Sequence, residues 1–420
     1  VHITIQPTDE YQRLPVASGV MGLIRRAEIR TSKGVVICQS DEIGQLMTLR
    51  NKWSAPELRE KKGVYLNGSY ECFESLANGK LRLKGDYDGT DGDKPIQYRI
   101  NKDNATQFSI KISQLFPEAL AHEIPVYLID GNLQLVLTWS DYKVRGVAST
   151  GDATNVDDTN HINITKCQYV SDHIFYDGKT MAQLQRESES NTGLVLPYND
   201  FNEVEFNLQA GDVGALKEHR KFMGLSNLRL KYILLQTQED GNTPTNGNMV
   251  NGVFNSRGSW HGDGGGDRIN IIINNRQWYP VDWARDNLLY RGLEGVYRKP
   301  LALPKQAYTS YGGTVDDCLV SAGGGTLNQI SVNNLFENDN YYNVSQDDTL
   351  TAYSHYMGIC FETAPGPIPN TGKKIGFVPV EFKYTRIGTT ENNKDLTLRA
   401  WCCVERLMTI KSGQVMVNYS

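Results

Sequence analysis

The sequence lacks the short motifs that usually mark an enzyme. It contains no GxSxG elbow, no HExxH pair, no GxxxxGK[ST] loop and no strand-GxGxxG-helix unit. Its seven histidines are isolated from one another, at positions 2, 122, 161, 173, 219, 261 and 355. We therefore interpret each one as a surface or core histidine. No catalytic residue, bound metal or cofactor is expected.

The sequence also lacks an excess of positive charge and long apolar runs, which limits the partners that the protein could bind. The formal charge is −5, so the chain lacks the excess of Lys and Arg that gripping nucleic acid requires. No apolar run approaches the roughly 20 residues that span a bilayer. The start, Val1-His-Ile-Thr-Ile5, has no charged-then-apolar leader. We expect no direct sequence-specific binding of nucleic acid, no transmembrane helix and no secretory signal.

Cysteines are few and form no recognisable metal or disulfide pattern. The seven lie at positions 38, 72, 167, 318, 360, 402 and 403, with no CxxC pair. On a strand, the adjacent Cys402 and Cys403 would point to opposite faces, which excludes a disulfide between them. We expect reduced, mostly buried thiols in a protein made in the cytosol.

What the sequence does contain is typical of a β protein. It has 39 Gly and 22 Tyr, with Asn, Asp, Thr and Ser throughout, which favours many short strands joined by long loops. At 420 residues it exceeds the size at which one core stops growing, so two domains are expected. Turn-forming residues from about Ser188 to Asp200 indicate the boundary between an N-terminal domain, 1–195, and a C-terminal domain, 196–420.

The clearest strand pattern surrounds Asp130-Gly131. Apolar runs lie on both sides of this dipeptide, and alternate residues from Leu133 to Trp139 are apolar. The pattern predicts a β-hairpin over 124–139 with one buried face. A similar order of residues recurs from Val378 to Trp401, which indicates two similar β modules in tandem.

Other elements follow from the hydrophobic period. Strands are predicted at 22–30, 35–38, 162–170, 201–208, 227–237, 269–273, 376–386, 396–410 and 414–419, with a turn at 411–413. Helices are predicted within 41–62 and at 114–121, 180–190 and 211–224. In the last of these, Val213, Leu216, Arg220 and Met223 lie at helical spacing between two glycines.

Several polar segments are interpreted as exposed loops. Asp86–Asp93 resembles a calcium loop, but its glycine and acidic positions are out of register. His261, Asp263 and Asp267 could ligate a metal, but a glycine-rich backbone holds ligands poorly. We interpret both as solvated surface, together with the long loops 148–160, 239–267 and 308–326.

Two pairs of residues keep a carbohydrate-active alternative open. Glu203 and Glu205 alternate on one strand face, as the carboxylates of β-sandwich glycoside hydrolases often do. A Glu-rich edge strand is the favoured interpretation. Trp278 and Trp283 would either form a sugar-stacking platform or pack beneath the loops.

Five sequons for N-linked glycosylation are present. They begin at Asn67, Asn104, Asn163, Asn343 and Asn418. A chain so rich in Asn, Ser and Thr contains several by chance, and their use depends on a compartment that the sequence does not give.

This combination resembles the double jelly-roll major capsid proteins of icosahedral DNA viruses. The group includes adenovirus hexon and the capsid proteins of large algal viruses, virophages, polinton-like viruses and some membrane-containing phages. The resemblance lies in element order and hydrophobic pattern over nearly the whole chain. The segments that carry it are 23–30, Phe116 followed by 124–128 and 132–135, 166–186, and 201–237.

The resemblance implies two tandem eight-stranded antiparallel jelly-roll sandwiches with short helices in the connecting loops. It implies a structural protein, not an enzyme, whose pseudo-hexameric homotrimers tile an icosahedral shell. The implied partners are neighbouring capsomers, penton and minor capsid proteins, and an internal membrane beneath the shell. The implied location is the virion, after synthesis in the host cytoplasm or nucleus. The alternatives are a carbohydrate-active enzyme or lectin with β-sandwich domains, and a viral spike or receptor-binding protein.

Overall fold

A computed structural model gives the fold of the chain. The structure describes residues 1–8, 12–14, 18–52, 66, 68, 73–75, 81–83, 105–116, 124–141, 147–148, 161–171, 174–209, 212, 214–225, 228–239, 268–278, 357–361, 372–387 and 395–419. Several predicted features lie outside these residues: the acidic segment 86–93, the loop 261–267, Trp283, the loop 308–326, and the sequons at Asn67, Asn104 and Asn343.

Among the described residues, the strands from the first part of the chain form ladders with one another. One antiparallel sheet has the order β10-β1-β7, another has the order β4-β3-β8, and two short pairs are β2-β9 and β5-β6. The strands are β1 (His2–Pro7), β2 (Gln12–Arg13), β3 (Ile24–Thr31), β4 (Val36–Asp41), β5 (Phe73–Ser75), β6 (Leu81–Leu83), β7 (Thr106–Ser109), β8 (Leu133–Trp139), β9 (Val147–Ala148) and β10 (Ile162–Gln168).

Strands from the second part form two more antiparallel sheets. The larger has the order β11-β19-β13-β16, with β17 beside β13 and β20 beside β19, and the smaller has the order β12-β18-β14-β15. The strands are β11 (Leu194–Leu208), β12 (Leu216–Phe222), β13 (Arg229–Glu239), β14 (Arg268–Ile273), β15 (Arg276–Gln277), β16 (Met357–Cys360), β17 (Lys373–Lys374), β18 (Val380–Ile387), β19 (Leu396–Lys411) and β20 (Gln414–Tyr419).

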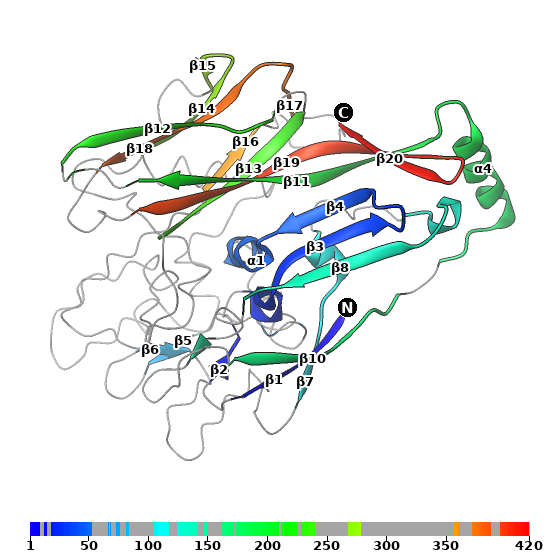
Figure 1. Ribbon diagram of the computed structural model, residues 1–420, viewed down its shortest axis with the longest axis horizontal. Helices are drawn as coiled ribbons and strands as arrows, with labels where there is room; N and C mark the ends of the chain where they lie inside the picture. The colour runs from blue at the N-terminus through cyan, green and yellow to red at the C-terminus, as the bar shows by residue number, and fades with distance from the viewer. Residues whose placement is uncertain are drawn as a thin grey trace.

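Short helices connect the sheets, and the four main sheets stack in layers (Figure 1). From the top of the view, the layers contain β12, then β19, then β3, then β1. The helices are the 3₁₀ turns η1 (Gly19–Leu23) and η3 (Val126–Leu128) and the α-helices α1 (Ile43–Lys52), α3 (Ile112–Leu115) and α4 (Gly178–Glu189). No helix in the described parts of the chain is long and apolar enough to cross a membrane.

The buried apolar residues that the structure describes form two cores. The first core gathers side chains from the first part of the chain, such as Ile3 and Ile24, together with Trp401 of β19. The second core lies between the two sheets of the second part and includes Ile271 and Phe382. Because β19 contributes to both cores, its sheet is apolar on both faces, which explains the near-continuous apolar run along this strand.

Most of the predicted elements are confirmed. The hairpin of β3 and β4, the helices α1 and α4, and the closing strands β18, β19 and β20 occupy nearly the predicted ranges. Asp177 caps α4 by accepting a hydrogen bond from the backbone N–H of Thr180 at 2.7 Å. The predicted turn between β19 and β20 is present, with Gly413 at φ +82°. The expected class, a mainly β antiparallel protein, is therefore confirmed.

The helix predicted over 211–224 is wrong. Residues 216–222 form β12, which pairs along its length with β18. Its side chains are alternately exposed and half-buried, which is the period of a strand. The residues at helical spacing misled the prediction, because pairing with β18 satisfies the backbone of this short segment and overrides its helical pattern.

The hairpin predicted over 124–139 is half wrong. Its second arm is β8, whose alternate apolar residues pack against the first core as expected. The first arm is the 3₁₀ turn η3, and β8 pairs with β3 instead. Pro125 has no N–H to donate to a strand, and its carbonyl accepts a hydrogen bond from Leu128 at 3.0 Å, which closes the turn.

The domain boundary at 195/196 stays a prediction. It falls just inside β11, and residues 197–200, which were expected to break the strand pattern, pair with β19 in register. Pro197 is tolerated because β11 lies at the end of the strand order in its sheet, where one side of the strand makes no ladder within the described residues.

Candidate functional site

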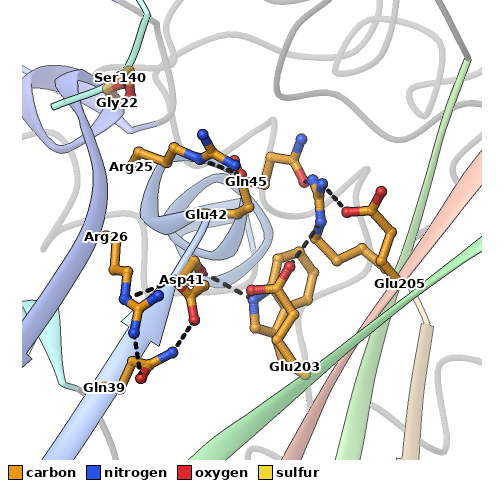
Figure 2. Close-up of polar contacts among 12 residues, drawn as sticks. Gly22, Arg25, Arg26, Gln39, Asp41, Glu42, Gln45, Ser140, Glu203 and Glu205 are labelled. Carbon is orange, nitrogen blue, oxygen red and sulfur yellow. Dashed lines mark hydrogen bonds and ion pairs between the residues drawn. The ribbon is translucent and has the colours of Figure 1, made fainter. Parts of the chain in front are cut away.

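Charged and polar side chains fill the junction between β4 and α1 on one side and β11 and β19 on the other (Figure 2). We call this junction the charged seam. It connects sheets that belong to different parts of the chain, so it bears on how the two parts are held together. Its members are Arg25, Arg26, Gln39, Asp41, Glu42, Gln45, Asp200, Glu203, Glu205, Arg399 and Arg406.

Arg399 of β19 links three side chains of the seam. Its Nε lies 2.8 Å from Oε1 of Glu203, and its Nη2 donates a hydrogen bond of 2.5 Å to Oε2 of Glu205. Its Nη1 donates to Oε1 of Gln45 on α1. One guanidinium therefore binds both carboxylates of β11 and also reaches across to the first part of the chain.

The carboxyl group of Glu203 has a raised pKa. Burial raises the pKa of its carboxyl to about 8, Arg399 acts against this shift, and Glu42, Asp41 and Glu205 add to it. Its Oε2 is buried and has no hydrogen-bond partner among the described residues. Since the cost of burying the charge outweighs the attraction of Arg399, a sizeable fraction of Glu203 is protonated near neutral pH.

Asp200 forms a second buried charge on the same strand. Burial raises the pKa of its carboxyl to about 7, while Arg406 opposes the shift. The Arg406 Nη1 lies 3.1 Å from Oδ2 of Asp200. Nearby, the Tyr198 hydroxyl donates a hydrogen bond to the backbone carbonyl of Ile37 on β4. β11 is therefore bound to β4 as well as to β19.

The end of β4 completes the seam. The indole Nε1 of Trp401 donates a hydrogen bond of 3.3 Å to the backbone carbonyl of Asp41. Arg26 donates a hydrogen bond of 2.7 Å to Gln39 and lies 3.4 Å from the Asp41 carboxylate. Arg25 pairs with Glu42 at 3.1 Å. Figure 2 shows Arg26, Asp41 and Glu42 close to the point where β4 runs into α1.

The geometry favours a structural role for the pair Glu203 and Glu205. Both are on β11 as predicted, and β11 lies at the end of its sheet order. A glycoside hydrolase needs space for a sugar between its two carboxylates. Here Arg399 of β19 binds both carboxylates, so the pair links β11 to β19.

The other candidate residues lie apart from the charged seam and from one another. Trp278 packs on Phe361, with ring centroids 5.0 Å apart, and Lys373 Nζ lies 5.5 Å from its ring centre. Trp278 thus packs against the second core, whereas the long loops beneath which it was expected to pack lie almost entirely outside the described residues. Asn163 on β10 and Asn418 on β20 are exposed, and their glycosylation stays a prediction. Among the residues described, no group of three or more His, Cys, Asp or Glu side chains could hold a metal ion.

Sequence reasoning missed Arg399, Gln45 and Asp200. One signal was available for Arg399, which is a lone charge inside the apolar run from Leu396 to Val404. A buried charge of this kind requires a partner. Gln45 carried no signal, because only the folded chain brings α1 to β19.

Comparison with known proteins identifies the fold. No protein-family model matches the sequence, and no curated protein matches it. A chain of the PBCV-1 virus capsid matches in structure with a TM-score of 0.51 and 8% identity, covering 100% of this chain and 89% of that one. A chain of the Sputnik virophage matches with a TM-score of 0.51 and 11% identity, covering 100% and 80%. At such identities the likeness shows the fold alone. The chain thus shares the mainly β, double jelly-roll fold expected from its resemblance to viral major capsid proteins.

Proposed function

We propose that this protein is a structural major capsid protein that assembles into the shell of an icosahedral virion. The observation that carries the proposal is the structural match to a chain of the PBCV-1 virus capsid, which extends over 100% of this chain. A match to one sandwich alone would leave the other free for a different function. The charged seam supports the proposal further, since Arg399 binds the carboxylates that an enzyme would need free.

The unit of assembly in this proposal is a pseudo-hexameric homotrimer. Its subunits would each contribute two jelly-roll modules, with the boundary near 195/196. A subunit that packs regularly in a shell requires its two modules to keep a fixed orientation relative to each other. The shared strand β19 and the charged seam supply that rigidity, because both bind the two parts of the chain together.

The partners that follow are neighbouring capsomers, penton and minor capsid proteins, and an internal membrane beneath the shell. The net charge of −5 suits a shell that lies over a packaged genome without binding it tightly. The alternatives, a carbohydrate-active enzyme or lectin and a spike or receptor-binding protein, are supported by no specific contact among the described residues.

Electron microscopy of the purified full chain tests the proposal. We expect particles of uniform, roughly hexagonal outline that form flat arrays or closed shells as the concentration rises. A glycan-binding and glycan-hydrolysis screen of the same preparation is the control for the alternative. Single small particles at every concentration, together with binding or cleavage of a glycan, would overturn it.

A further inference from the structure

Five large apolar side chains are exposed on the segment that joins β10 to α4. None of the described strands or helices includes this segment. We call residues 169–171 and 174–176 the arm, which runs toward α4 at the right of Figure 1. Its apolar side chains and their exposed fractions are Tyr169 59%, Val170 61%, Ile174 63%, Phe175 85% and Tyr176 40%.

The apolar area of the arm is large for a free surface. Single exposed apolar residues are ordinary on a soluble protein, but a contiguous apolar patch of several hundred Å² usually marks a contact. Aromatic side chains bury about 150–250 Å² each, so Tyr169, Phe175 and Tyr176 at their exposed fractions present about 280–460 Å², to which Val170 and Ile174 add. A stable interface buries about 800 Å² on each partner. The arm alone would supply more than half of that area.

The residue types of the arm also favour contact with another molecule. Tyr, Val, Ile and Phe are the residues most enriched in strands, yet the arm lies outside every described strand. Lys166, Asp177 and Lys179 flank it with charges of both signs, so a surface of either sign can approach it. A β-prone segment of this kind gains strand or side-chain partners by binding another molecule.

We infer that the arm is a segment by which one copy of this chain holds a second copy. The inference rests on the proposed function, because the most numerous neighbours of a major capsid protein in its shell are other copies of the same chain. It goes further by naming the residues that make the contact. Phe175, the most exposed of the five, would be buried at its centre.

A photo-cross-linker tests the contact directly in the full chain. Position 175 is replaced by p-benzoylphenylalanine, the assembled protein is irradiated, and covalent dimers are measured on a denaturing gel. The matched control carries the same probe at Phe377, which is 88% exposed on the segment before β18. We expect dimers from position 175 at several times the yield from position 377.

Three results would overturn the inference and leave the proposed function intact. The first is an assembled preparation in which position 175 forms no dimers, and the second is an equal dimer yield from both positions. The third is a wild-type chain that binds lipid vesicles, loses this binding on Phe175→Ser and forms no dimer through position 175, which would assign the arm to a membrane instead. A wild-type chain that never assembles would overturn the proposed function, and the inference with it.

Substitution gives the second readout. Phe175→Ser is expected to raise the concentration needed for assembly at least tenfold, whereas Phe377→Ser leaves it unchanged. Both side chains are almost fully exposed in the single chain, so both variants should fold and unfold at the wild-type temperature. Normal assembly of Phe175→Ser would contradict the inference.

Discussion

Cys402 and Cys403 are adjacent in β19, yet their side chains lie in different hydrophobic cores. The alternation of a strand sends Cys403 toward the first core and Cys402 toward the second. The sheet that contains β19 is therefore a shared layer, and the two parts of the chain cannot separate without exposing one of its faces. The expectation from the sequence, that these two thiols point to opposite faces, is confirmed.

Thiol reactivity should follow this placement. In the native protein Cys167, which is exposed, should react with iodoacetamide, whereas Cys38, Cys402 and Cys403 should stay unmodified. Burial raises the pKa of the thiols of Cys38 and Cys402, which further reduces their reactivity. Peptide mass spectrometry before and after unfolding in urea measures the labelling. Rapid labelling of Cys402 or Cys403 in the native state would contradict the two-core arrangement.

Removal of the guanidinium at the centre of the charged seam should destabilise the protein strongly. Arg399→Met leaves Glu203 buried without its charge partner, which we expect to lower the free energy of unfolding by about 3 kcal/mol at pH 8. Adding Glu203→Gln should restore part of the loss, because the neutral amide needs no counter-charge. Urea denaturation measures both variants.

The matched control for that experiment is an exposed ion pair. Arg220 and Glu218 lie 2.6 Å apart on β12, and both are largely in solvent. Arg220→Met should unfold like the wild type, since exposed pairs contribute little. Equal losses for Arg399→Met and Arg220→Met would mean that the seam does not join the two parts of the chain.

Stability should fall as the pH rises from about 5 to 8. Burial raises the pKa values of Asp200 and Glu203 to about 7 and about 8 in the folded chain, from ordinary values of 3.8 and 4.5. Between these values the folded state holds more protons than the unfolded state, so the free energy of unfolding decreases with pH. The decrease is at most about 1.4 kcal/mol per pH unit for each group, and it ends above the folded pKa values.

Neutral variants isolate this contribution. Asp200→Asn and Glu203→Gln should each flatten the pH dependence over that range in urea titrations at pH 5, 6.5, 8 and 9. A slope that survives in the double variant would show that other groups cause it. A wild-type stability that increases through this range would contradict the burial of the two carboxyls.

The turn between α4 and β11 should not tolerate a side chain. Gly193 has φ +74°, and a Cβ there would lie 2.9 Å from the backbone oxygen of Ile410. Gly34 has φ +88°, but a Cβ there would meet nothing within 4 Å. We expect Gly34→Ala to cost about 1 kcal/mol from the backbone conformation alone and Gly193→Ala about 2–3 kcal/mol, measured by thermal unfolding. Equal costs would contradict the close approach of this turn to β19.

Elements with a clear hydrophobic period were predictable from the sequence. The strands β3, β8, β13 and β19 were expected because alternate or continuous apolar residues decide which face is buried. The segment 211–224 was not, because four residues at helical spacing in a short, largely exposed stretch are a weak signal compared with pairing to β18. Pro197 was read as a strand breaker because the sequence does not reveal which strands lie at the edge of a sheet.

The candidate site was less predictable than the fold. Glu203 and Glu205 were noticed because they share one strand face, but their partner Arg399 is almost 200 residues away in the sequence. Contacts between distant strands depend on the register and order of the sheets, which no local pattern encodes. The strand predicted over 162–170 extended into the arm. Residues 169 and 170 are β-prone, and the sequence does not show that they lie beyond the end of β10.

The mass of the purified chain in solution, measured by multi-angle light scattering, tests the central claim most directly. A major capsid protein that forms homotrimers should have three times the 47.1 kDa mass of the single chain, with larger assemblies at higher concentration. A mass of one chain at every concentration tested, with no assemblies, would contradict the account.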